Sequence, residues 1–490
     1  MPKPPLPLPS QSTSQPFGSI SPLEMASAGD SSSFQVKIIS KTLIKASDTT
    51  IQPYVLYPSN LDHLPSNIPS PFLTIYPKPP SGGDYSSVAA TLRRTLPTFL
   101  NYFFPFTGRI RPDRNGVPEI YCNNEGAELV VARADIRLAD VNFHDKSKSL
   151  ERIELPYEEE IPLSIQVVGF ACGGFSIVWG GTHLLSDGHG LSFLPTLWTE
   201  YVRTGELSRI PNHDRSIFRP RSPPSYSPET DRSLACLTPD DLINSLSAGA
   251  FVKRLYHVDG KHIDRLRELA SREGRSATRM EAFSAYLWKS LAKAVGDSDV
   301  GCRMAWLVDA RQRLGPKYTE AMKDYMGNVI TFATKEAGVA ELVNGSYSQV
   351  AGMVSAAVKE VADNAEDHFQ EMIDWVEGHK VGKRANRVQV GLGSPALVVS
   401  SFHHMNMNLD FGLGQAALAI PDLPWGRLGS AFVIVLASPK GDGSLYMNAY
   451  IWSQLAVVLE SDPDRVFKPA TAEGLGVVEP ASHQVWLSRL

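Results

Sequence analysis

The chain has 490 residues, of which 43% are hydrophobic and 20% are charged, and its formal net charge is -5. This length allows two sizeable hydrophobic cores, while the mildly acidic charge argues against a nucleic-acid-binding surface. The four cysteines lie far apart without a Cys-x-x-Cys pair, so we expect no disulfide framework, no structural zinc and a reducing, cytoplasmic location. No apolar run approaches the ~20 residues that span a bilayer, so no membrane partner is expected.

The first segment, residues 1–33, is rich in proline and serine and is predicted to be disordered. Met25 stands shortly before the first strand-like segment, Phe34–Ile39. We therefore hypothesise that translation of the native protein starts at Met25.

Strand-like and helical patterns alternate irregularly over residues 34–215. The apolar spacing of Val88–Tyr102 predicts a helix that Pro97 kinks or shortens, and Gly190–Arg203 predicts a helix with one apolar face. Strands are predicted at Glu119–Cys122, Leu129–Val131, Leu163–Phe170 and Phe175–Trp179.

A proline-rich segment, Arg219–Pro228, lies near the midpoint and predicts a linker. The predicted division is a first domain at 34–215, a linker at 216–244 and a second domain at 245–490. The second domain carries predicted helices at His262–Glu273, Thr278–Val295 and Tyr347–Ala362, and predicted strands at Arg303–Val308, Val388–Leu392, Leu397–Ser401, Phe432–Ala437 and Leu445–Tyr450. This mixed order favours an α/β fold with mixed sheets flanked by helices over a doubly wound parallel sheet.

The segment directly after the strand Phe175–Trp179 contains the strongest candidate for chemistry. His183 and Asp187 stand four positions apart, and Gly188 follows the acid. A histidine at the end of a buried strand is suited to acid–base catalysis, the carboxylate can hold the loop, and the glycine would allow a sharp bend. Two other interpretations stay open: an ordinary buried histidine with Asp187 capping a turn, and a metal site completed by His189.

A second cluster, Asp410-Phe-Gly-Leu-Gly414, lies in the last fifth of the chain. It lacks the companion motifs of a kinase magnesium loop. It also lacks the following helix of a dinucleotide fingerprint, because Pro421 and Pro424 come too soon. Taken alone, the pattern favours a tight structural turn.

The two clusters together resemble the plant BAHD acyltransferases, which carry His-x-x-x-Asp-Gly in mid-chain and Asp-Phe-Gly-Trp-Gly near the end. Leu413 departs from this pattern, because the family has tryptophan at this position. The family pattern therefore does not predict the packing of residue 413 or the adjacent pocket wall. The ending is most similar to coniferyl alcohol acyltransferase and hydroxycinnamoyltransferase-like members. Supporting blocks lie at Leu56–Asp62, Phe104–Ile110, Asp309–Arg313 and Tyr325–Val329.

The resemblance implies two domains similar to chloramphenicol acetyltransferase, with a solvent channel between them. It implies that His183 is a general base and that Asp187 pairs with Arg311 or Arg313. Asp410 and three glycines are expected to be structural: Gly188, Gly412 and Gly414. A basic group is either a solvated loop or part of a site for a CoA phosphate: Lys380, Lys383, Arg384 and Arg387.

The implied reaction transfers a hydroxycinnamoyl, other aromatic or acetyl group from acyl-CoA to the hydroxyl of a small phenolic metabolite through a ternary complex. Acyl-CoA is then a co-substrate, with no tightly bound cofactor and no metal, and the protein is expected to be a monomer. An amine acceptor is the first alternative. A metal-dependent hydrolase and a non-catalytic acyl-CoA or metabolite-binding protein are the others.

Overall fold

The structure is a computed structural model that describes residues 34–65, 67–80, 82–236, 250–296, 300–379, 386–388, 394–403, 409–422 and 429–478. The predicted tail at 1–33, with Met25, lies outside the described residues. So do residues 237–244 of the predicted linker, and Lys380, Lys383 and Arg384 of the basic group. Residues from Phe34 onward form one compact unit, and the predicted domain boundaries stay a prediction.

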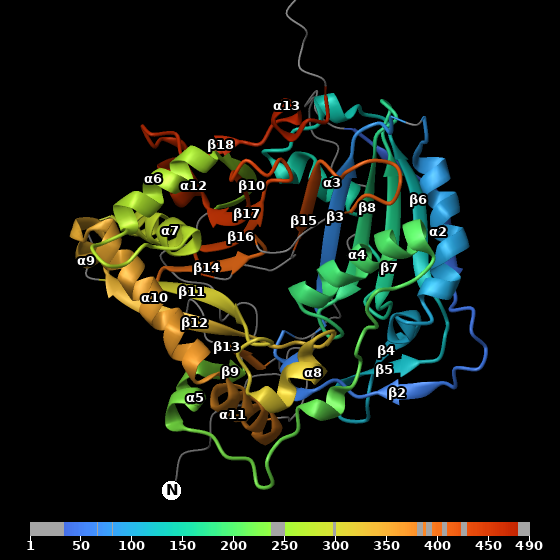
Figure 1. Cartoon of the computed structure of the whole chain (residues 1–490), viewed down its shortest axis with the longest axis horizontal. Helices are drawn as coiled ribbons and strands as arrows, with labels where there is room; N and C mark the ends of the chain where they lie inside the picture. Colours follow the sequence, from blue (N-terminus) through green and yellow to red (C-terminus); the bar gives the residue numbers. More distant parts are fainter. Residues whose placement is uncertain are drawn as a thin grey trace, which may run out of the picture. The chain divides into compact units, whose positions relative to one another are not determined.

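The first half of the chain builds most of a six-stranded mixed sheet (Figure 1). Only the β6–β7 pair is parallel, and the other neighbours are antiparallel. The edge strand β15 comes from the second half and pairs with β3. In sheet order the strands are β1 (Val36–Ile44), β6 (Ala127–Ala134), β7 (Leu163–Gly169), β8 (Phe175–Thr182), β3 (Pro69–Tyr76) and β15 (Leu418–Pro421).

The second half builds a seven-stranded mixed sheet, in which β11 pairs with β14, and β14 with β16, in parallel. The strands in order are β12 (Ile330–Gly338), β11 (Gly301–Asp309), β14 (Ala396–Ser401), β16 (Ala431–Ala437), β17 (Leu445–Trp452), β10 (Phe251–Val258) and β18 (Lys468–Pro469). Two small sheets consist of β2 (Tyr54–Leu56), β5 (Pro118–Cys122) and β4 (Arg109–Pro112), and of β9 (Leu234–Cys236) and β13 (Asn386–Val388). The predicted α/β fold with mixed sheets is confirmed.

Helices cover one face of each large sheet, and the other two faces contribute to a shared core. The run in β16 shows why both faces are apolar: Val433 and Val435 point to the helix side, while Ile434 and Leu436 point to the shared core. The six-stranded sheet packs against α2 (Tyr85–Phe99) and α4 (Gly188–Thr204), and the seven-stranded sheet against α6 (Gly260–Ala270), α7 (Arg279–Val295), α10 (Tyr347–Asp363) and α12 (Ser453–Glu460).

The remaining helices are mostly short and lie at loops and connections. They are α1 (Asn60–His63), α3 (Leu150–Ile153), α5 (Pro228–Ser233), α8 (Thr319–Met322), α9 (Val339–Asn344), α11 (Ala365–Gly378) and α13 (Ala472–Leu475). Within the described part of the chain, no helix is long and apolar enough to cross a membrane.

Candidate active site

His183 directly follows the last residue of β8, which lies between β7 and β3 in the six-stranded sheet. Its backbone N–H donates to the carbonyl of Ile68 at 2.8 Å, just before β3 begins. The side chain is 4% exposed. A central strand and a hydrogen bond to its neighbour therefore hold the backbone of this histidine.

The imidazole of His183 is oriented by Asn328, which comes from the segment before β12. Nδ1 of the ring lies 2.9 Å from Oδ1 of Asn328, and Nδ2 of Asn328 donates to the carbonyl of His183 at 2.8 Å. An amide oxygen only accepts hydrogen bonds, so Nδ1 must carry the proton. The lone pair of the neutral ring is therefore on Nε2, the nitrogen that can act as a base.

Burial keeps this ring neutral. It lowers the pKa of His183 below the ordinary value of 6.5, and the negative charge of Asp187 and the hydrogen bond that the ring donates to Asn328 offset only part of this shift. An imidazole that is neutral at physiological pH can accept a proton from a bound substrate.

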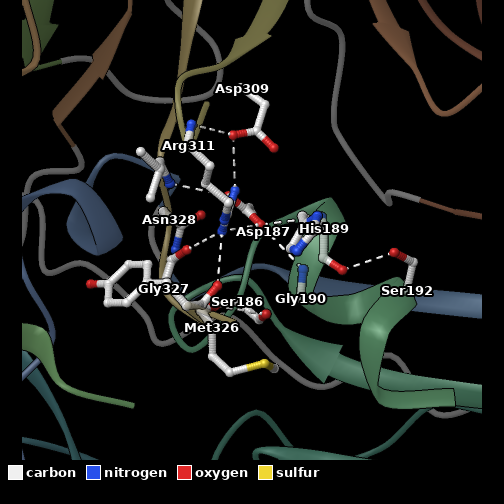
Figure 2. A network of polar contacts seen from close by, with 12 residues as sticks. Ser186, Asp187, His189, Gly190, Ser192, Asp309, Arg311, Met326, Gly327 and Asn328 are labelled. Atoms are coloured by element: carbon white, nitrogen blue, oxygen red, sulfur yellow. Dashed lines mark hydrogen bonds and ion pairs between the residues drawn. The ribbon is translucent and has the colours of Figure 1, made fainter. Parts of the chain in front are cut away.

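Asp187 points to Arg311 in a buried, bidentate ion pair (Figure 2). Oδ2 accepts from Nη1 at 2.8 Å and Oδ1 from Nη2 at 3.0 Å, and both residues are almost fully buried. Arg311 also donates to the carbonyl of Gly327 at 2.6 Å. Of the two arginines considered from the sequence, Arg311 is the partner, whereas Arg313 is exposed and donates to the carbonyl of Asp309.

The same carboxylate of Asp187 holds two other segments. As the N-cap of α4, it accepts from the backbone N–H of His189 at 3.1 Å and of Gly190 at 3.3 Å, and it also accepts from Val329 at 3.0 Å. Burial alone would raise the pKa of Asp187, but the guanidinium of Arg311 brings it below its ordinary value. The carboxylate of Asp187 therefore has a structural role.

The structural role of Asp187 argues against a metal site formed by His183, Asp187 and His189. Both oxygens of Asp187 already accept hydrogen bonds from Arg311. Among the described residues, no three His, Cys, Asp or Glu side chains are grouped so that they could hold a metal ion. The geometry therefore favours an ion-paired loop over a metal centre.

Gly188 has a different role from the sharp bend that the sequence suggested. It is the first residue of α4 and does not have the positive φ that favours glycine. Instead, a Cβ at this position would lie 2.4 Å from Cζ of Phe402. The helix start therefore packs closely against the second half of the chain, and any larger residue here would displace the ring of Phe402.

A cavity of about 730 Å³, including the part open to solvent, lies at His183 between the two halves of the chain. Apolar side chains form most of its wall, with His183 and Asp309 among the polar groups. Such a lining suits an acyl chain or an aromatic ring. The apolar wall includes Phe72 and Leu191 from the first half, and Leu307, Ile330 and Phe402 from the second.

The Asp410–Gly414 cluster forms a tight turn. Oδ1 of Asp410 accepts from the N–H groups of Gly412 and Gly414 at 2.8 and 3.1 Å, and both glycines have positive φ angles, of 100° and 105°. Phe411 is buried among aromatic rings of the first half. Leu413 packs against the same core, and neither it nor the other residues of the turn line the His183 cavity.

The sequence reasoning did not single out two residues that support the catalytic loop. Asn328 orients the ring of His183, and Arg215 donates to the carbonyl of Leu185 at 2.6 Å. Asn328 lies in the block Tyr325–Val329 that resembles the family, but spacing alone could not place it beside His183. Arg215 carried no local signal.

Comparisons with known proteins agree on one family. The model of the Transferase family matches residues 34–464. Agmatine hydroxycinnamoyltransferase 1 of Oryza sativa subsp. japonica is 28% identical, over 81% of this chain and 91% of the relative. Shikimate O-hydroxycinnamoyltransferase of Nicotiana tabacum is 25% identical, over 89% of this chain and 98% of the relative.

Two solved structures share the fold. Vinorine synthase superposes with a TM-score of 0.69 at 21% identity, over 89% of this chain and all of that one. TRI101 of F. graminearum, solved with coenzyme A and deoxynivalenol, superposes with a TM-score of 0.67 at 15% identity, over 84% and 98% of the two chains.

Proposed function

Because the chain belongs to the Transferase family, that of the BAHD acyltransferases, we propose that it transfers an acyl group from acyl-CoA to the hydroxyl of a small acceptor, with His183 as general base. The observation that carries this proposal is the state of His183. Its ring is buried, lies with Nδ1 against Oδ1 of Asn328, which favours the tautomer with the base on Nε2, and lines a cavity between the two halves of the chain.

The reaction runs in a ternary complex without a covalent acyl-enzyme. Nε2 of His183 takes the proton of the acceptor hydroxyl while the oxygen of this hydroxyl attacks the thioester carbonyl. The tetrahedral intermediate collapses by breaking the C–S bond, and the imidazolium returns the proton to the leaving thiolate, giving an ester and free CoA. A positioned base contributes about 10²–10⁴-fold to such a rate. Ser186 is an unsuitable nucleophile because it is buried and its hydroxyl donates to the carbonyl of Met326 at 2.9 Å.

Asp187 and Arg311 keep the catalytic loop in shape. Their ion pair joins the start of α4 to the segment after β11, so it fixes His183 relative to the opposite wall of the cavity. Asp187 makes no hydrogen bond to the imidazole of His183 among the described contacts, which supports a structural role over proton transfer.

The names of the relatives and the apolar wall support a hydroxycinnamoyl or related aromatic acyl group as the donor. The relative named for shikimate supports a hydroxyl acceptor, and the one named for agmatine keeps an amine acceptor as the second candidate. The same base serves both acceptors, since each must lose a proton as it attacks. A cytoplasmic, monomeric protein remains our expectation.

The test is an assay of thiol release and product mass with coumaroyl-, feruloyl-, benzoyl-, malonyl- and acetyl-CoA against phenolic, aliphatic and amine acceptors. We expect turnover with at least one aromatic acyl-CoA, and a loss of about 10²-fold or more in kcat for His183→Gln. The matched control is His213→Gln, which replaces a partly buried histidine that contacts the carbonyl of Tyr102 and does not line the cavity. Near-normal turnover of His183→Gln would contradict the mechanism.

A further inference from the structure

A second buried carboxylate, Asp62, lies behind the residue that orients His183. Asp62 is the last but one residue of α1 and is 0% exposed. Its Oδ1 accepts from both the backbone N–H and the side-chain Nδ2 of Asn328, at 2.8 and 2.7 Å. Two bonds from one residue to one oxygen fix both the backbone and the amide plane of Asn328.

These bonds also decide which way the amide of Asn328 points. Its Nδ2 lies between two acceptors, Oδ1 of Asp62 and the carbonyl of His183. A flipped amide would place an oxygen against two oxygens and lose both bonds, which is costly for buried groups. Oδ1 of Asn328 is therefore held toward Nδ1 of His183.

The other oxygen of Asp62 anchors this arrangement to the rest of the site. Oδ2 accepts from the N–H and the hydroxyl of Ser59, each at 2.8 Å, and forms an ion pair with Nε of Arg215 at 3.0 Å. Arg215 in turn donates to the carbonyl of Leu185, inside the loop between His183 and Asp187. Asp62 thus holds both the partner of the imidazole and the loop that carries the imidazole.

We infer that Asp62 is a positioning residue for the general base, acting on His183 through the amide of Asn328. This inference rests on the proposed role of His183. Asp187 is not available for this task, because Arg311 and the backbone of α4 and Val329 use its two oxygens. A neutral amide between the carboxylate and the ring selects the tautomer without placing a full negative charge against the imidazole.

The experiment compares Asp62→Asn, Asn328→Ala and the double variant by steady-state kinetics. We expect each single variant to lower kcat by on the order of 10²-fold, which is part of the rate that a positioned base contributes. The KM for acyl-CoA should change less than kcat. Because both residues act through one contact with the imidazole, the double variant should be no slower than Asn328→Ala alone.

A pH profile gives a readout that general destabilisation would not move. The negative charge of Asp62 raises the pKa of His183, so Asp62→Asn should shift the acidic limb of kcat/KM to lower pH. The matched control is Thr278→Ala, which removes the N-cap of α7 without touching the cavity and should lower the melting temperature. Its acidic limb and kcat should stay those of the original enzyme.

Unchanged kcat in Asn328→Ala, or effects that multiply in the double variant, would overturn the inference. Asn328→Ala leaves the ion pair of Asp62 and Arg215 in place, so it decides the question even if Asp62→Asn does not fold. Loss of activity in His183→Gln together with normal Asp62 and Asn328 variants would refute only this inference. An active His183→Gln enzyme would instead refute the proposed function.

Discussion

At the scale of single residues, His183 and Asp187 have separate partners despite their close spacing. The ring of His183 is held by Asn328, whereas the carboxylate of Asp187 binds Arg311. Contact with the neutral amide of Asn328 suits a base that must be unprotonated before the reaction. The ion pair with Arg311 suits a carboxylate that must stay charged inside the protein. In the proposed mechanism, His183 therefore supplies the base, and Asp187 holds the loop in shape.

The state of His183 predicts the pH dependence of the reaction. Burial lowers its pKa below 6.5, so the ring stays neutral as the pH falls through 6.5 and gains a proton only at lower pH. We therefore expect kcat/KM to be level around neutral pH and to fall with an acidic limb centred below 6.5. Rates measured from about pH 5 to 8 in a buffer of constant ionic strength check this. An acidic limb centred above pH 6.5 would be inconsistent with a buried neutral base.

At the scale of elements, the junction between β8 and α4 carries the site. The strand ends at Thr182, and Asp187 caps the helix that begins at Gly188. The glycines of this junction permit close packing: a Cβ at Gly181 would lie 2.4 Å from Cδ2 of Leu191, and one at Gly188 would meet Phe402. The short loop between two regular elements is therefore fixed at both ends.

The ion pair at this junction predicts unequal effects of two neighbouring arginines. Arg311→Ala leaves Asp187 buried without its partner, so we expect the free energy of unfolding to drop by about 3–5 kcal/mol, with loss of soluble yield. Asp187→Ala should be similarly destabilising, because it also removes the N-cap of α4. Arg313→Ala, at an exposed side chain, is the control and should unfold like the original protein in urea titrations. Equal stability of all three variants would show that the ion pair contributes little.

At the scale of the whole molecule, the two halves of the chain complete each other. Strand β15 of the second half extends the first sheet (Figure 1). The buried Lys146 of the first half donates to Asp422 at 2.7 Å and to Asn448 at 2.8 Å in the second. The cavity at His183 takes its wall from both halves. Neither half of the chain forms this cavity alone.

The proposed mechanism, in which both substrates occupy this cavity, predicts the kinetic order. If acyl-CoA and acceptor bind together, initial rates at varied concentrations of both should give intersecting double-reciprocal lines. Parallel lines with an acyl-protein trapped by mass spectrometry would indicate a covalent intermediate and contradict direct transfer. A buried Ser186 whose hydroxyl is already hydrogen-bonded supports the first outcome.

Much of the fold was predictable where local patterns are strong. Helices with a regular apolar face, such as α4, α7 and α10, were predicted to within a few residues, because 3.6-residue periodicity is a local property. Strand β3 was not predicted: Pro69 and Pro71 argue against an interior strand, yet β3 pairs with β8 and β15. Strand β15 is four residues long and is defined by its partner, so its own sequence carries little signal.

The sequence by itself placed His183 and Asp187 in one short segment as the candidate site residues, and it determined the mixed order of strands and helices. Only the tertiary structure decided that Arg311 rather than Arg313 meets Asp187, that Asn328 orients the imidazole, and that Asp62 holds Asn328. These contacts join residues 124, 145 and 266 positions apart. Differences of a few tenths of an ångström decide whether a hydrogen bond forms. Such positions are set when distant segments pack, and they leave no periodic pattern along the chain.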